Sequence, residues 1–519
     1  MILNGKKIGI LCIVLALLLL VPTFAACGQD VDDPVESNGD VIDTTNQNGE
    51  TGTEYQIRYD DKGYEMDDLD IKGVNLGGKE VKILIGDEAE VRVDADQLTT
   101  PLNSAIFSRH MSVEKRLNCK LTLIKEQSGW DYRSSFVKKM QELMVGDEVN
   151  LVACYSLTHS SMMIQGMLAN LGDSNNLDFS RPWWNQQMVD GCTIYDKIYF
   201  CSGDISHNLI GESVALRFNK ELALSSNLSA WLNGKYGVDN MYDLVESGEW
   251  TIDKFYEICK MVYVDEDGTK GEEDIFGFAA YANSIDAFFQ GCGMKSLVTG
   301  SDGSIMISED MNSLKADGVM TDLQSFLESS ATAPENTIGG LSANSGYCER
   351  IWKNGRSLFF MASVSGISRE DTFEKGVLPL PKYDTVQEKY YTSPNFGYQL
   401  WGVARGTKID YEELCGVLEC LASEGYRKVT PAYFETTLAN RQDSAEDYKM
   451  LYTIRDGIVI DGGRVMDSAF ETNTWSIWRR CMMYGHEYLN YYDKYENSLT
   501  EQAVSLNSMM RNLEYLYQS

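Results

Sequence analysis

The chain has little of what metal-dependent and nucleotide-dependent enzymes require. Four of its 519 residues are histidine, and its 12 cysteines show no CxxC or cysteine–histidine spacing of a metal site. His486-Glu487 opens an HExxH-like run, but position 490 is Asn, so the zinc motif is incomplete. Gly291–Ser296 lacks the glycine spacing of a phosphate-binding loop. We therefore predict no catalytic residues, no metal and no cofactor.

The segment Asp265–Gly268 is the nearest approach to a calcium-binding loop. Compared with the EF-hand pattern, its glycine comes two positions early, and Phe276 stands where the bidentate glutamate belongs. We predict a solvated turn there. Carboxylates are abundant elsewhere, and a glycoside hydrolase needs two of them about 5–10 Å apart. No motif selects such a pair, so a surface glycoside hydrolase is the alternative function.

Basic residues are scarce relative to acidic ones. Lys and Arg number 45 against 77 Asp and Glu, which gives a formal net charge of −32. Such a charge repels nucleic acid and anionic lipid surfaces, so neither is predicted as a partner. It also makes an anionic ligand less favourable unless basic residues cluster locally, and the sequence shows no convincing cluster.

The apolar run at the N-terminus is too short to span a membrane. Ile8–Val21 has 14 residues, or about 21 Å of helix against a hydrocarbon core of about 30 Å. Lys6 and Lys7 precede it and small residues follow, so residues 1–26 are predicted to be a secretory signal peptide. Cys27 stands directly after Ala25-Ala26, which resembles a bacterial lipobox and implies lipidation (palmitate) of Cys27. An ordinary signal peptide with a chance cysteine is the alternative.

The segment after Cys27 is predicted to be a tether. Gly28–Glu54 holds eight acidic residues and no Lys or Arg, and a chain of this composition buries too little surface to fold. Residues 27–76 are therefore predicted to be the lipidated cysteine and a disordered acidic tether. The body, from about Gly77 to Ser519, exceeds the size of a single core, so we expect two globular lobes.

The first half of the body predicts a parallel sheet with helices on its faces. Strands are expected at 80–85, 119–124 and 150–154, and helices at 104–117 and 131–145. Ligands on such sheets bind beyond the carboxyl ends of the strands. Asp87, Trp130 and Tyr155 follow the three strands and are candidate ligand-binding residues.

A cross-strand disulfide is one possibility further along the chain. A two-residue turn at Asp196-Lys197 would place Cys192 opposite Cys201. Asp-Lys is a poor turn pair, however, and the scattered cysteines also suit an exported protein with free, buried thiols.

The order of the segments resembles the extracellular solute-binding proteins of ABC importers, in particular the carbohydrate-binding group that includes maltose-binding protein. The resemblance covers the chain from about Glu80 to the C-terminus. It rests on a series of short segments: Gly86-Asp87, Gly146–Val152, Tyr195–Tyr199, Asp204, Arg217–Lys220, Gly248–Thr251, Asp274–Gly277, Gly355-Arg356, Gly376–Tyr383, Gln387–Tyr391 and Thr430-Pro431.

This resemblance implies an α/β, two-lobe, periplasmic-binding-protein-like (type II) fold. Each lobe would be a sheet flanked by helices, with the ligand in the cleft between the lobes, which close by hinge bending. Lobe 1 would contain residues 79–212 and 400–455, and lobe 2 would contain residues 213–399 and 456–519.

Further candidate ligand-binding residues come from loop positions that the resemblance highlights. Asp204 and Asp286 are candidate acceptors for sugar hydroxyls, and Glu212 lies near the crossing between lobes. Trp475 and Trp478 are three residues apart in a C-terminal segment where the family often supplies a stacking aromatic ring, and on a helix they share one face. For each tryptophan, a place in the core is the alternative.

Other tryptophans are expected to be structural or are left undecided. Trp231, Trp250 and Trp352 occur within helical patterns or at a helix start and are predicted to be structural, whereas Trp183, Trp184 and Trp401 are undecided.

The resemblance implies a substrate-binding lipoprotein of an ABC transporter rather than an enzyme. It would capture a small-molecule solute, which the resemblance predicts to be an oligosaccharide. It would deliver this solute to the transmembrane subunits of a permease. It would be held at the extracellular face of the membrane by its lipid anchor, as in Gram-positive bacteria. There are two alternatives: the ligand is not a sugar but, for example, a peptide, or the partner is a sensor kinase.

Overall fold

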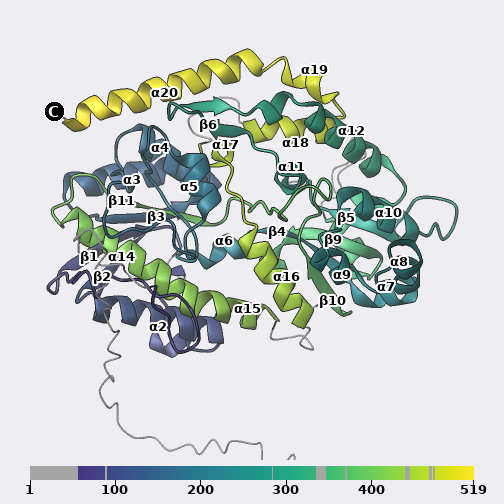
Figure 1. Cartoon of the computed structure of the whole chain (residues 1–519), viewed down its shortest axis with the longest axis horizontal. Coiled ribbons are helices and arrows are strands. Elements are labelled where there is room, and N and C mark those ends of the chain that lie inside the picture. The colour runs from purple at the N-terminus through teal and green to yellow at the C-terminus, as the bar shows by residue number, and fades with distance from the viewer. Residues whose placement is uncertain are drawn as a thin grey trace, which may run out of the picture. The chain divides into compact units, whose positions relative to one another are not determined.

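Two sheets, each flanked by helices, organise the protein in the computed structural model (Figure 1). The structure describes residues 57–87, 90–282, 284–334, 346–368, 371–438, 445–466, 470 and 474–518. The predicted signal peptide, Cys27 and most of the predicted tether lie outside these residues. Among the described residues, no helix combines the length and apolar character that crossing a membrane requires.

The first sheet has the strand order β11-β3-β1-β2. β1 pairs in parallel with β2 and β3, and β11 runs antiparallel to β3. The bounds are β1 (Glu80–Ile85), α2 (Pro101–Arg116), β2 (Lys120–Lys125), α3 (Arg133–Val145), β3 (Leu151–Tyr155) and β11 (Gln399–Val403). Thr100 caps α2 by accepting a hydrogen bond from Asn103 N, and Pro101 suits the first helical position. The predicted β-α-β-α-β order is confirmed.

The second sheet has the order β10-β4-β9-β5-β8 and mixes parallel and antiparallel pairs. β4 runs antiparallel to β9 and β10, whereas β5 is parallel to β8 and β9. The bounds are β4 (Val214–Asn219), β5 (Phe276–Ala280), β8 (Thr332–Pro334), β9 (Ser357–Ser363) and β10 (Lys375–Leu378). β6 (Leu297–Thr299) and β7 (Ile305–Ile307) form a separate hairpin.

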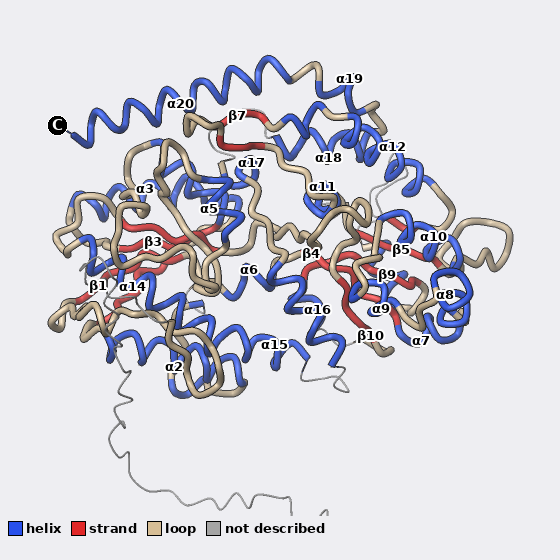
Figure 2. Tube along the Cα trace, viewed as in Figure 1, coloured by secondary structure: helices blue, strands red, loops and turns tan. Residues whose placement is uncertain are grey.

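Helices surround both sheets, as Figure 2 shows. Their bounds are α4 (His159–Ile164), α5 (Gln186–Cys192), α6 (His207–Gly211), α7 (Lys220–Ser225), α8 (Leu228–Tyr236), α9 (Met241–Glu246), α10 (Ile252–Val262), α11 (Ala287–Gly291), α12 (Leu314–Glu328), α13 (Tyr347–Lys353), α14 (Tyr411–Glu424), α15 (Thr430–Leu438), α16 (Ala445–Asp456), α17 (Gly462–Val465), α18 (Thr474–Tyr484), α19 (Tyr488–Tyr492) and α20 (Glu496–Gln518). Short helical turns include η3 (Trp130–Tyr132) and η4 (Ser156–Thr158).

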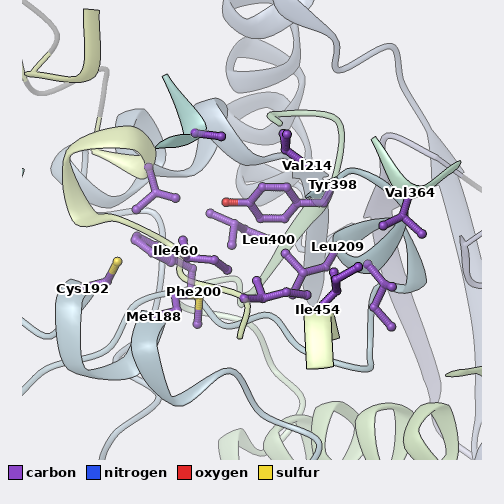
Figure 3. Close-up of a cluster of buried hydrophobic side chains, with 14 of the residues drawn as sticks. Met188, Cys192, Phe200, Leu209, Val214, Val364, Tyr398, Leu400, Ile454 and Ile460 are labelled. Carbon is purple, nitrogen blue, oxygen red and sulfur yellow. The ribbon is translucent and has the colours of Figure 1, made fainter. Parts of the chain in front are cut away.

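The chain crosses between the two sheets in segments 212–214 and 392–395. A third segment, 457–459, lies against segment 392–395. Val214 N donates to Ser393 O at 3.0 Å, and Asn395 N donates to Glu212 O at 2.8 Å. Thr392 bonds in turn to Gly457 and Val459, at 2.8 Å each. Apolar side chains pack around these segments, among them Val214, Tyr398 and Ile460 (Figure 3). The lobe boundaries given above stay a prediction.

The packed body begins earlier than residue 77, where the predicted tether ends. Tyr59–Ser519 cluster into one unit by their contacts. Leu69 and Leu76 are buried, and the buried carboxylate of Asp67 accepts hydrogen bonds from Arg116 at 2.5 and 2.9 Å. Burial of these apolar side chains explains why this stretch packs despite its polar composition, and Arg116 offsets part of the desolvation of the Asp67 carboxylate.

Cys192 and Cys201 are free and buried, so the possible disulfide is not formed in this structure. Ile194 bridges to Lys197, and Tyr195 and Asp196 both have positive φ, of 49° and 60°. The turn thus lies one residue earlier than Asp196-Lys197, and positive φ at both central residues matches a type I′ turn. Cys192 ends α5 instead of lying in a strand opposite Cys201.

Candidate ligand-binding site

The carboxyl ends of β1 and β3 meet the start of β11 at one edge of the first sheet. Asp87 Oδ2 accepts a hydrogen bond from Asn208 Nδ2 at 3.1 Å, and Asp87 O accepts one from Gln399 Nε2 at 3.2 Å. Tyr155 ends β3 and is the register partner of Gln399. The structure thus brings two predicted site residues, Asp87 and Tyr155, to either side of Gln399.

Gln399 is a polar residue of this edge that sequence reasoning missed. Its side chain is buried, and its Oε1 has no hydrogen-bond partner among the described residues. An unsatisfied buried acceptor costs free energy, which a donor on a ligand would recover. The available signal was a glutamine at the start of an otherwise apolar strand.

Glu90, three residues after Asp87, is a second residue that the sequence did not reveal. Its carboxylate is fully buried and accepts hydrogen bonds from Ser206 Oγ at 2.6 Å and Asn208 N at 2.9 Å. Burial raises the pKa of Glu90 from 4.5 to about 7, and the nearby charge of Asp87 adds to the shift. Arg109, from α2, donates to the backbone oxygen of Glu90 and opposes the shift.

Glu212 lies where the chain leaves the first sheet. Burial raises the pKa of its half-buried carboxyl, and a hydrogen bond from the backbone of Gly397 opposes that rise. A Cβ at Gly397 would lie 2.7 Å from the Glu212 carboxyl carbon, so a side chain there would displace the carboxyl from its present position. Glu212 is therefore held against the segment that returns the chain to the first sheet.

Trp130 lines a pocket at the start of α3. The pocket has a volume of about 640 Å³ and lies between α3, the η4–α4 segment and Phe470. Half of the Trp130 surface is exposed, at 51%, and the Arg133 guanidinium lies over its ring at 4.1 Å. On the walls, Gln141 Nε2 donates to Gln165 Oε1 at 2.9 Å. The described residues that line the pocket are Trp130, Arg133, Ser134, Val137, Lys138, Gln141, Thr158, Ser161, Gln165 and Phe470.

Asp204 and Asp286 are both engaged in buried ion pairs. Asp204 pairs with Arg455 and also accepts a hydrogen bond from Thr430. Asp286 Oδ2 accepts from Arg464 Nη1 and its Oδ1 accepts from Arg479 Nη2, each at 2.8 Å. Neither residue lines the pocket at Trp130. The contact of Asp204 and Asp286 with a ligand stays a prediction. In the structure, each carboxylate has hydrogen-bond partners within the protein.

The tryptophans divide between the core and the surface. Trp478 is buried and packs edge-on against Phe289, with ring centroids 4.3 Å apart. The side chain of Trp475 lies outside the described residues. Trp250 and Trp352 are buried, which confirms their predicted structural role. Trp183 and Trp184 are buried too, and both indole nitrogens donate to the Glu419 carboxylate, at 3.1 and 2.8 Å.

The acidic segment near residue 265 is shaped by backbone hydrogen bonds. Asp265, Asp267 and Asp274 bring one carboxylate oxygen each within 4.8 Å of the others. Asp265 accepts from Gly268 N, and Asp274 accepts from Glu266 N and Gly271 N. These bonds stabilise a turn, the structure that the sequence predicted there.

Comparison with known proteins was made by sequence and by structure. No family model matches the chain, and no curated protein matches its sequence. Among solved structures, a cyclo/maltodextrin-binding protein complexed with maltotetraose is similar, with 14% identity and a TM-score of 0.51, over 83% of this chain and 96% of that one.

Two further solved structures are similar to a comparable degree. An extracellular solute-binding protein from Staphylococcus aureus in complex with maltose has 14% identity and a TM-score of 0.52, over 82% of this chain and 98% of that one. UspC of M. tuberculosis has 13% identity and a TM-score of 0.51, over 82% of this chain and 100% of that one. The predicted resemblance is therefore confirmed in its fold: this chain has the two-lobe α/β fold of the extracellular solute-binding proteins.

Proposed function

We propose that this protein is the substrate-binding lipoprotein of an ABC transporter, which captures an oligosaccharide between its lobes and delivers it to a membrane permease. The observation that carries the proposal is the pocket at Trp130, which opens beside the carboxyl-terminal edge of the first sheet. Its volume of about 640 Å³ falls within the range of about 300–1,000 Å³ typical of small-molecule sites.

The chemistry of the pocket suits a sugar. Arg133 covers one face of the half-exposed indole, and the surface that it leaves exposed can contact the C–H face of a pyranose ring. Gln141, Gln165 and Ser161 offer donors and acceptors for hydroxyl groups. The role is one of binding and not of catalysis. Maltose and maltotetraose, the ligands of two structurally similar proteins, are the first compounds to test.

Closure around the ligand would carry the signal to the permease. The linking segments 212–214 and 392–395 are short and hydrogen-bonded to each other, so a change of a few backbone angles there would rotate one sheet against the other. A ligand that contacts both halves favours the closed form by its difference in affinity for the two forms. Asp87, Tyr155 and Glu212 are proposed to contact the ligand near this point.

Trp130→Ala is expected to weaken saccharide binding about 30-fold, because a central aromatic contact contributes about 2 kcal/mol. A thermal-shift screen of saccharides first identifies a binder, since ligand at 100 times its Kd adds about 2.7 kcal/mol of stability. Titration calorimetry then compares the variants. Trp231→Ala, which removes a half-buried indole on α8 outside the pocket, should leave Kd unchanged. Equal losses in the two variants would contradict a role for Trp130 in binding.

Cys27→Ala is expected to release the protein from the membrane into the medium. A diacylated N-terminal cysteine supplies two chains, which together anchor a protein stably. Fractionation of cells that express the wild type or the variant measures the effect, and the released variant should bind saccharide with the wild-type Kd. If the variant stays with the membrane fraction, the lipid anchor is not at Cys27.

A further inference from the structure

The described lining of the pocket at Trp130 differs in charge from the protein as a whole. Acidic residues outnumber basic ones by 77 to 45 along the chain. Among the ten described residues that line the pocket, however, Arg133 and Lys138 are basic and none is acidic. The positive lining contrasts with a protein whose general field repels anions. We infer that the captured saccharide is acidic and places its anionic group against Arg133 and Lys138.

The start of α3 adds to the positive potential at this site. α3 has 13 residues, and its first turn supplies Arg133 and Ser134 to the pocket. Among the described residues, no side chain caps this end and no acidic residue occurs in the first turn of α3, although Asp131 precedes it in η3. The positive end of the helix dipole is therefore not offset by a carboxylate of the helix itself. Arg133 and the helix end thus favour the same sign of ligand charge.

The positions of the groups define the ligand further. The Arg133 guanidinium lies over one face of the Trp130 ring, 4.1 Å from its centroid, so an anionic group that approaches this face meets the guanidinium directly. Lys138 lies on the same pocket wall of α3, is exposed and has no ion-pair partner among the described residues. Guanidinium and ammonium groups both bind carboxylates and phosphate-like esters through charge-assisted hydrogen bonds. The ligand class is therefore an oligosaccharide with a uronic acid, sulfate or phosphate group, and this inference rests on the proposed function.

Matched saccharides test the inference. Titration calorimetry at low salt compares oligogalacturonate with the same oligosaccharide after methyl esterification, and sulfated and phosphorylated oligosaccharides form two further arms. We expect at least one acidic compound to bind about tenfold or more tightly than its neutral counterpart, with a difference that shrinks as salt rises. The arm that binds best identifies the anionic group.

Lys138→Gln should then weaken binding of that acidic saccharide about tenfold and leave neutral saccharides unchanged. Lys139→Gln removes the same charge one residue along α3, outside the pocket lining, and should change neither. Neutral saccharides that bind as tightly as acidic ones would overturn the inference and leave the proposed function in place. An absence of binding to every saccharide would overturn both.

Discussion

Asp286→Asn is expected to destabilise the protein by about 3–5 kcal/mol, the largest effect that we predict for a single substitution. Asp286 is 3% exposed and accepts hydrogen bonds from Arg464 and Arg479. Asparagine keeps the shape of the side chain but removes its charge, so two guanidinium groups lose the carboxylate that offsets their desolvation. Urea unfolding followed by circular dichroism gives the change in midpoint and in free energy.

Asp302→Asn is the matched control for this experiment. Asp302 lies 3.9 Å from Arg511, and both side chains are mostly exposed, so the loss should be within about 1 kcal/mol. The comparison also tests the role predicted from the sequence, in which Asp286 binds a ligand. A variant that keeps wild-type stability but loses saccharide binding would favour that role over the ion pair.

Glu90→Gln is expected to change the pH dependence of stability. The pKa of Glu90 rises from 4.5 in the unfolded chain to about 7 in the folded protein, so the folded state holds this proton more tightly. The stabilisation from Glu90 is complete below about pH 4.5 and is lost as pH rises through about 7. Glutamine resembles the protonated acid. As the pH rises from 4.5 to 7, the free energy of unfolding of the variant should therefore increase by about 3 kcal/mol relative to that of the wild type.

The groups around Glu90 make this test specific. Asp87 raises its pKa, Arg109 lowers it, and Tyr433 from α15 is close enough to have its own pKa raised by Glu90. Urea unfolding at several pH values gives the two stability curves, and Glu142→Gln, on the exposed face of α3, is the control. Wild-type and Glu90→Gln curves that stay parallel from pH 4.5 to 7 would show that Glu90 does not titrate in this range.

Local patterns were sufficient to predict the elements of the first sheet. Strand β1 and helix α2 appear within three residues of their predicted bounds, because apolar periodicity and caps act over a few neighbouring residues. The fold class followed from the order of such elements, because a β-α-β unit has few ways to pack. The turn at Tyr195-Asp196 was misplaced by one residue, since positive φ at both positions is not evident from their residue types.

The pairing of polar groups could not be predicted in the same way. Asp204 and Arg455 are 251 residues apart, and Asp286 and Arg464 are 178 apart, so only the folded chain shows that these carboxylates have partners. The sequence did not indicate Glu90 or Gln399 as site residues, because their burial arises from contacts with distant segments. In the sequence, nothing distinguishes Arg133 and Lys138 from other helix residues. Only the folded chain shows that α4 and Phe470 enclose the space beside them.

The sequence by itself predicted an α/β fold and showed only incomplete motifs for metal or nucleotide binding. It also predicted candidate ligand-binding residues, aromatic or acidic, after each parallel strand of the first sheet. Only the tertiary structure decided which of these side chains are paired inside the protein and which line a pocket. The reason is physical: secondary structure depends on interactions between near neighbours, whereas burial and charge compensation depend on segments that meet only after folding.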